Sequence, residues 1–316
     1  MPAIPTLCIG LPVRNGEAFL AEALDSLLAQ SFRDFEITIS DNASTDRTPD
    51  ICQRYARLDR RIRYSRNGRD IGAGPNFNRA FRGCRSPWFK WMAHDDMLAP
   101  GALDRLLEAA GRDGVVLAHS RIALVDDGGA PLPVLPGGRL TDRRGRPFHA
   151  PEPPHLAEGP DPAVRFAEAL RHMNWCTAVF GVIRADALAR THLHGSYYEA
   201  DRVLLAELAL LGRFVQLDEP LLVKRCHEGV SVLKSYAEQA RMIDPALPPW
   251  PKGVRLRLGY LKALAVEGPR PATRLACAGT VLRVSLRNRL SRRLQALLRR
   301  SPSLPPGYRP ERTRPP

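Results

Sequence analysis

Short apolar strands alternate with amphipathic helices over the first 120 residues, and this alternation constrains the fold more than any other feature. The expected strands are Thr6–Leu11, Phe35–Ser40, Arg61–Ser65, Trp88–Ala93 and Val115–His119. The expected helices between them are Glu17–Gln30, 44–58, Asn76–Arg82 and Pro100–Arg112. Strands that alternate with helices predict an α/β fold, with a mostly parallel sheet covered by helices on both faces.

Three polar clusters follow the expected strands: Pro12–Glu17, Asp41–Asp46 and His94–Asp96. In open parallel sheets, ligands bind beyond the carboxyl ends of the strands. The clusters therefore predict a binding site at that edge. The chain has no GxGxxG after the first strand and no GxxxxGK[ST], so neither a dinucleotide fold nor a P-loop is indicated.

The acidic pair Asp95 and Asp96 comes directly after an apolar strand. Such a pair is often a plain turn. At a strand end, however, a carboxylate can hold Mg²⁺ or Mn²⁺ against a diphosphate, because these ions prefer oxygen ligands and share them with phosphates. Asp41, at the tip of the second strand, could accept a hydrogen bond from a base or a ribose. Ser44 or Thr45 could cap the helix that follows.

Taken together, the motifs resemble glycosyltransferase family 2, whose members have the GT-A fold. The matching runs are IGLPVRNGEAFLAEALDSLLAQSFRDFEITISDNASTDRT, NFNRAF and FKWMAHDDMLAP. The resemblance is strong over residues 5–120, weaker over 160–230 and absent afterwards. It implies inverting transfer of a sugar from a nucleoside-diphosphate sugar to a hydroxyl acceptor, with Mn²⁺ or Mg²⁺ as cofactor. The family favours UDP-sugars, and GDP- or dTDP-sugars stay open.

The resemblance also implies roles for single residues. Three residues of the first cluster would lie against the nucleotide: Pro12, Asn15 and Glu17. Asp41 would contact the base, and Asp95 the ribose or donor sugar. Asp96 would bind the metal, although the sequence His-Asp-Asp departs from the family's usual D-x-D and leaves the role of Asp95 open.

Candidates for the acceptor side lie farther along the chain. Asp201 precedes the apolar helix Val203–Leu211, and the resemblance implies that it is the general base, with Glu199 as second choice; an N-cap is the other interpretation of Asp201. His227 would touch the diphosphate or the metal, or would be a surface histidine. Trp175 would stack on an acceptor sugar or belong to the core.

The basic charge lies in one region of the chain. Residues 1–251 carry 31 Lys and Arg against 31 Asp and Glu, whereas 252–316 carry 16 against two. A neutral body does not favour nucleic-acid binding. The expected helix Val281–Arg300 has leucines on one face and arginines around the rest, which is typical of binding to an anionic membrane surface. Packing on the catalytic domain, with the arginines in water, is the alternative.

We therefore expect a donor-binding half at 1–125, an acceptor-binding and catalytic half at 126–230, and a basic helical extension at 231–316 with a Pro/Arg-rich end. Residues 126–162 are rich in Gly and Pro and predict a long loop. The region from 126 to 175 would determine which acceptor binds. If the chain attaches to a membrane, a lipid-linked glycan or a surface polysaccharide is the expected acceptor.

Six scattered cysteines without a CxxC pair favour reduced thiols over a zinc site or a disulfide framework. Neither a signal peptide nor a run of about 18 apolar residues is evident, so the expected location is the cytoplasm, with peripheral attachment at the inner membrane face. Two other classes of protein are alternatives. A sugar nucleotidyltransferase would need a Gly-rich basic loop after the first strand, and a non-catalytic nucleotide-sugar-binding protein would not need the acidic residues.

Overall fold

An eight-stranded mixed sheet forms the centre of the computed structural model, which describes residues 3–135, 139–141, 147–149, 152–227, 236–246 and 253–299. Its strands are β1 (Leu7–Val13), β2 (Phe35–Asp41), β3 (Ile62–Arg66), β4 (Trp88–Trp91), β5 (Met97–Leu98), β6 (Val115–Val125), β10 (Val182–Arg184) and β11 (Arg213–Arg225). The order is β3-β2-β1-β4-β10-β6-β11-β5, and only the short strands β10 and β5 run antiparallel to their neighbours. The predicted α/β fold with a mostly parallel sheet is confirmed.

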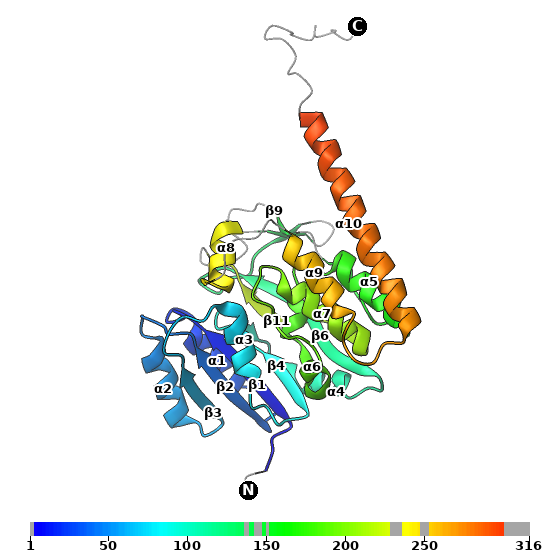
Figure 1. Cartoon of the computed structure of the whole chain (residues 1–316). Helices are drawn as coiled ribbons and strands as arrows, with labels where there is room; N and C mark the ends of the chain where they lie inside the picture. The colour runs from blue at the N-terminus through cyan, green and yellow to red at the C-terminus, as the bar shows by residue number, and fades with distance from the viewer. Residues whose placement is uncertain are drawn as a thin grey trace, which may run out of the picture.

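Helices cover both faces of the sheet (Figure 1). One face packs against α1 (Leu20–Leu28), α2 (Thr48–Leu58) and α4 (Ala102–Ala110). The other packs against α3 (Ala73–Phe81), α5 (Pro162–His172), α6 (Ala185–Ala189) and α7 (Ala200–Leu211). Successive side chains of a strand point to opposite faces. Accordingly, Leu7, Ile9 and Leu11 of β1 join the first core, and Cys8 joins the second.

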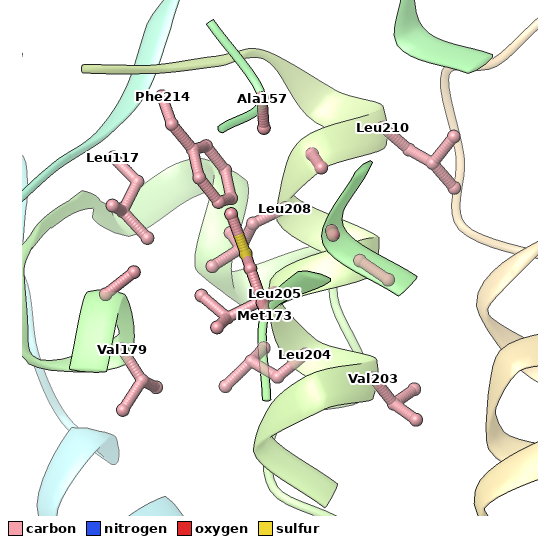
Figure 2. Close-up of a cluster of buried hydrophobic side chains, with 14 of the residues drawn as sticks. Leu117, Ala157, Met173, Val179, Val203, Leu204, Leu205, Leu208, Leu210 and Phe214 are labelled. Carbon is pink, nitrogen blue, oxygen red and sulfur yellow. The ribbon is translucent and has the colours of Figure 1, made fainter. Parts of the chain in front are cut away.

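Helix α7 is buried along almost its whole length, and Figure 2 shows how it is held. Leu204, Leu205 and Leu208 are fully buried and pack with Phe214 and Met173. Burying an aliphatic side chain of this size stabilises the fold by about 1.5–3 kcal/mol. This packing therefore holds α7, including its first turn, in a fixed position.

Residues 177–184 form a 3₁₀ helix (η1, Thr177–Phe180) followed by β10. Strand β11 passes register shifts around Pro220 while it stays paired with β6. One local expectation, the capping of the second helix, differs from the structure. Helix α2 begins at Thr48, whose amide donates to Asp46 Oδ1 at 3.0 Å, so neither Ser44 nor Thr45 is its cap.

The Gly- and Pro-rich region 126–162 is not wholly a loop. It forms a small antiparallel sheet, β7-β8-β9, from Val134–Leu135, Arg139–Thr141 and Pro147–His149. Pairing between the strands gives the backbone N–H and C=O groups of this segment hydrogen-bond partners. The Gly and Pro residues of the sequence do not indicate this pairing.

Three helices follow the sheet: α8 (Tyr236–Ile243), α9 (Val254–Ala263) and α10 (Pro271–Arg299). Helix α10 packs by its first turns on α5 and α9 and then runs away from the body (Figure 1). Within the described residues, no helix combines the length and the apolar character needed to cross a membrane. The expected Pro/Arg-rich end at 301–316 lies outside the described residues, and the three-part division of the chain stays a prediction.

Candidate active site

The first two polar clusters are joined at the carboxyl edge of the sheet, because β1 and β2 are parallel neighbours. Asn15 Oδ1 accepts from the amide of Thr45 at 2.9 Å, and the Asn15 amide donates to Ser44 Oγ at 3.0 Å. Glu17 Oε2 accepts from the amide of Arg47 at 3.0 Å. Pro12 is buried in β1 opposite Ser40. These contacts give Asn15 and Glu17 a structural role that the motif alone did not indicate.

The third cluster meets the first at Gly16. A Cβ added to Gly16 would lie 2.6 Å from Cδ2 of His94, so only glycine allows this approach. The amide of Gly16 also donates to Thr48 Oγ1 at 2.8 Å. All three clusters predicted from the sequence therefore converge at one edge of the sheet.

Asp41 is completely buried, and both of its carboxylate oxygens have partners. Oδ1 accepts from the Ser44 amide at 2.8 Å, and Oδ2 accepts from the Tyr64 hydroxyl at 2.8 Å with Arg66 Nε at 3.4 Å. Tyr64 and Arg66 are contacts that the sequence analysis missed. Asp41 orders the loop after β2, and its predicted contact with a nucleotide base stays a prediction.

The two adjacent aspartates face different surroundings. Asp96 is fully buried; its Oδ2 is 3.2 Å from Lys224 Nζ, and its Oδ1 accepts from the Arg225 amide at 3.1 Å. Asp95 lines the cavity described below, and its Oδ2 lies 3.1 Å from His227 Nε2. Both oxygens of Asp96 thus have partners on β11, and its role as the metal ligand stays a prediction.

Electrostatics separates the same two carboxyl groups. Burial raises the pKa of Asp96. Burial alone would also raise the pKa of Asp95, but the hydrogen bond with His227 and the nearby charges of His94 and Lys224 hold it below its usual range. Asp95 is therefore the member of the pair that faces the cavity and whose charged form is favoured by its surroundings.

Arg225 fixes the end of β11 against the acidic pair. Its guanidinium is 1% exposed, donates to Glu22 Oε2 at 2.5 Å and to the Asp127 carbonyl at 2.7 Å, and stacks 4.7 Å from the ring of Phe19. Sequence analysis missed Arg225 and Lys224. The sequence does place these two basic residues together at the carboxyl end of a strand, and this pattern could have predicted that they face the acidic pair.

The acceptor-side candidates lie across the same cavity, which has a volume of about 290 Å³. Asp201 stands at the start of α7, and its Oδ1 accepts from the Arg202 amide at 2.9 Å. Burial raises the pKa of Asp201 to about 6, and the Glu199 charge adds to the shift. Glu199, in the left-handed region at φ 67°, also lines the cavity.

Aromatic side chains complete the cavity wall. Trp175 lines it, and its amide donates to Glu152 Oε1 at 2.5 Å, which orients the loop before η1. Phe77, Tyr197 and Tyr198 also line the cavity. Trp175 both lines the cavity and packs, partly buried, on the cluster of Leu124 and Cys226, so its stacking on an acceptor sugar stays a prediction.

The donor side offers a carboxylate and an imidazole to a metal ion, Asp95 and His227. Carboxylate oxygens suit Mn²⁺ and Mg²⁺, and such ions usually complete their shells with substrate phosphates and water. No group of three or more His, Cys, Asp or Glu able to hold a metal occurs among the described residues. Asp95 and His227, whose Oδ2 and Nε2 lie 3.1 Å apart, are residue types that fit an ion shared with a diphosphate.

Comparisons with known proteins agree with this architecture. Residues 8–152 match the sequence profile of Glycosyl transferase family 2. A Bacillus subtilis protein, the uncharacterised glycosyltransferase EpsJ, is 33% identical over 109 residues, which are 34% of this chain and 31% of the relative. A Campylobacter jejuni protein, GalNAc(5)-diNAcBac-PP-undecaprenol beta-1,3-glucosyltransferase, is 32% identical over 109 residues, 34% of this chain and 35% of the relative. These matches span about a third of the relatives' lengths.

Solved structures extend the likeness over most of the fold. S. aureus TarS 1–349 in complex with UDP-GlcNAc superposes with a TM-score of 0.58 and 17% identity, covering 87% of this chain and 71% of that one. The mannosyltransferase PcManGT from Pyrobaculum calidifontis, in complex with GDP-Man and Mn²⁺, gives 0.53 and 15%, covering 93% and 85%. The fold is of the GT-A type. Residues 8–152, a little under half of the chain, carry the match to glycosyltransferase family 2.

Proposed function

We propose that this chain is an inverting glycosyltransferase that moves a sugar from a nucleoside-diphosphate sugar to an acceptor hydroxyl. One observation carries the proposal: Asp95 and Asp201 line the same cavity at the carboxyl edge of the sheet. The first belongs to the donor motifs, and the second stands at the start of α7. A single cavity between them allows direct displacement at the anomeric carbon, because both reactants can be held there together.

In this proposal Asp201 is the general base. With a pKa of about 6 it is mostly ionised at neutral pH, and it remains more basic than an ordinary aspartate. It would take the proton from the acceptor hydroxyl as that oxygen attacks. Glu199 is the second candidate, and its ion pair with Arg202 at 3.4 Å makes it less available as a base.

On the donor side, Asp95 and His227 would hold Mn²⁺ or Mg²⁺, which when bound stabilises negative charge on the departing diphosphate. Lys224, which lines the cavity and whose Nζ lies 3.2 Å from Asp96 Oδ2, would add positive charge near that diphosphate. We propose a UDP-sugar as donor. TarS, which shares the fold, was solved with UDP-GlcNAc, while PcManGT was solved with GDP-Man and Mn²⁺.

The nucleotide would lie over the joined clusters after β1 and β2, against Pro12, Asn15, Glu17 and Asp41. Asn15 and Glu17 hold the two loops together, so they would shape this surface as well as contact the ligand. Substitution of either residue is expected to weaken donor binding without removing the general base.

The test is nucleoside-diphosphate release from a panel of UDP-, GDP- and dTDP-sugars by the full chain. Asp201→Asn should lower turnover by about 10²–10⁴-fold, the usual contribution of a general base. Asp218→Asn is the matched control, since its carboxylate is 65% exposed in a surface ion pair with Arg121. Full transfer activity in Asp201→Asn would contradict the role of Asp201 as base. In that case Glu199→Gln tests whether Glu199 is the base instead.

We also propose that α10 attaches the protein to an anionic membrane surface and that the acceptor is a lipid-linked or surface glycan. One face of α10 is buried at Cys277 and Val281, while Leu275, Leu282 and Leu286 are 76%, 60% and 57% exposed. These leucines recur at helical spacing on another face, and a basic amphipathic helix binds membranes by apolar insertion plus charge. The C. jejuni relative's name includes a polyprenol-linked glycan.

Liposome sedimentation tests the membrane proposal. Full-length protein should bind vesicles containing anionic phospholipid, and Leu282→Asp with Leu286→Asp should abolish binding. Leu258→Asp on α9, at a position 52% exposed, is the matched control. Equal binding of the double variant and the control would remove the idea.

A further inference from the structure

Cys8 and Cys84 lie side by side in the fold although 76 residues separate them, and neither lines the cavity with Asp95 and Asp201. Cys8 belongs to β1 and is 1% exposed. Cys84 lies between α3 and β4 and is half-buried. Their thiols are hydrogen-bonded to each other.

The topology explains this contact. Helix α3 returns the chain from the carboxyl end of β3 to the amino end of β4, so it runs back along β1. A Cβ added to Gly10 would lie 3.0 Å from the carbonyl of Ala80. Cys8 is two residues nearer the amino end of β1 and points to the same face. Cys84 follows Ala80 by four residues, in the segment that runs from α3 toward the amino end of β4. This segment therefore passes beside Cys8.

The two thiols differ in access and in charge. Cys84 lines a surface cavity of about 550 Å³ that also carries Arg85 and Arg184. The hydrogen bond from Cys8 lowers the pKa of Cys84, and the same bond, with burial, raises the pKa of Cys8. Cys84 lines the surface cavity, whereas Cys8 is 1% exposed, so Cys84 is the thiol that a small oxidant can reach. Because reactive thiols are the ones reachable from solvent, Cys84 is the nucleophile of the pair and Cys8 is the partner behind it.

We propose that Cys8 and Cys84 are a peroxide-sensitive dithiol that closes to a reversible disulfide. The Cys84 thiolate attacks one oxygen of hydrogen peroxide; an S–O bond forms, the O–O bond breaks and hydroxide leaves. The Cys8 sulfur then attacks the sulfenic sulfur of Cys84; the S–S bond forms and the S–O bond breaks, releasing water. Two thiols lose two electrons and two protons, and the peroxide is reduced to two waters. A dithiol reductant reverses the bond by exchange.

The disulfide would fasten the end of α3 to β1. The first turns of α3 carry Ala73, Gly74 and Phe77 in the wall of the cavity, and the opposite end of β1 leads into the Pro12–Glu17 cluster. Closing a loop of this length restrains the unfolded chain, so the oxidised protein should melt at a higher temperature than the reduced protein. This inference does not depend on the proposed transfer reaction.

The experiment treats folded full-length protein with hydrogen peroxide, blocks free thiols with N-ethylmaleimide and digests it without reduction. Mass spectrometry should find a peptide pair linked through Cys8 and Cys84, lighter by two hydrogens and released by dithiothreitol. Cys84→Ser should lose both the linked peptide and the rise in melting temperature, whereas Cys52→Ser should keep both.

Cys8→Ala gives a second and opposite readout. Without its partner, Cys84 should accumulate as sulfenic acid, detected with a dimedone probe, instead of forming a disulfide. Oxidation of Cys84 to sulfinic acid in the wild-type protein without a link to Cys8 would overturn the proposal. So would an unchanged Cys84 thiol after peroxide treatment of the wild-type protein.

Discussion

Replacing Asp201 by Asn should stabilise the protein while it removes transfer activity. The carboxyl group stands at the start of a helix whose body is buried, and burial raises its pKa from 3.8 to about 6. An aspartate held in this way favours the protonated form in the folded state. Its charge at neutral pH is therefore a cost to folding, retained because the ionised group is the proposed base.

The magnitude follows from the pKa difference. Raising the pKa of Asp201 from 3.8 to about 6 corresponds to about 3 kcal/mol, because a pKa difference of one is worth about 1.4 kcal/mol. Because the folded pKa is raised, the penalty is absent below about pH 4, grows between pH 4 and 6, and is complete above pH 6. Asp201 is partly exposed, so about 3 kcal/mol is an upper limit and we expect a gain of about 1–3 kcal/mol in Asp201→Asn. The Asn oxygen can still accept from the Arg202 amide.

Urea unfolding at pH 7.5 and pH 5 measures this gain. The free energy of unfolding of Asp201→Asn should exceed that of the wild type at pH 7.5, and the difference should shrink to roughly half at pH 5. Asp218→Asn, a change of the same chemistry at the surface, should show no such pH-dependent gain. A destabilised Asp201→Asn, or a gain that is equal at both pH values, would refute the claim that the carboxylate is desolvated.

Three further predictions follow from the site. The kcat/KM for transfer should rise with pH through an apparent pKa near 6, because Asp201 must be ionised to act as base; a flat profile between pH 5 and 8 would contradict that role. Asp96→Ala should lower the free energy of unfolding by about 3–5 kcal/mol, measured by urea titration, since Lys224 and the Arg225 amide would both lose their buried partner; a loss below about 1 kcal/mol would show that Asp96 does not hold β11 in place. Glu207→Gln should weaken the fold by about 1–3 kcal/mol and speed proteolysis of the loop before α7, because the buried Glu207 carboxylate accepts from the His192 amide at 2.8 Å and contacts its ring at 2.6 Å; unchanged cleavage would refute this anchor.

The N-terminal half of the fold was predictable because its signals are local. Period-2 apolar strands and period-3.6 helices identified the strands β1 to β4 and the helices between them, and parallel topology then placed the three polar clusters at one edge. The predicted cap of helix α2 was wrong. Ser44 is a good cap by composition, yet its hydroxyl accepts from Asn15 across the edge, and Asp46 serves the helix.

The site itself depended on long-range pairing that no local pattern contains. Asp95 and Asp96 are adjacent, and only the approach of β11 decides that Lys224 and the Arg225 amide take the second carboxylate while His227 meets the first. Similarly, the short β-sheet in the Gly- and Pro-rich region depends on pairing between segments that look like turns. Asp201 could be identified as a candidate from its place before an apolar helix. Its raised pKa required the burial that the fold supplies.

Separate measurement of donor binding and of transfer tests the central claim most directly. Calorimetry with UDP and Mn²⁺ should show that wild type and Asp201→Asn bind the nucleotide with the same Kd, whereas Asp95→Asn loses the metal-dependent part of the affinity. Sugar transfer from the best donor should then fall in both variants. Failure of every nucleoside diphosphate to bind the wild type, or full transfer by Asp95→Asn, would contradict a donor site built on Asp95 across the cavity from Asp201.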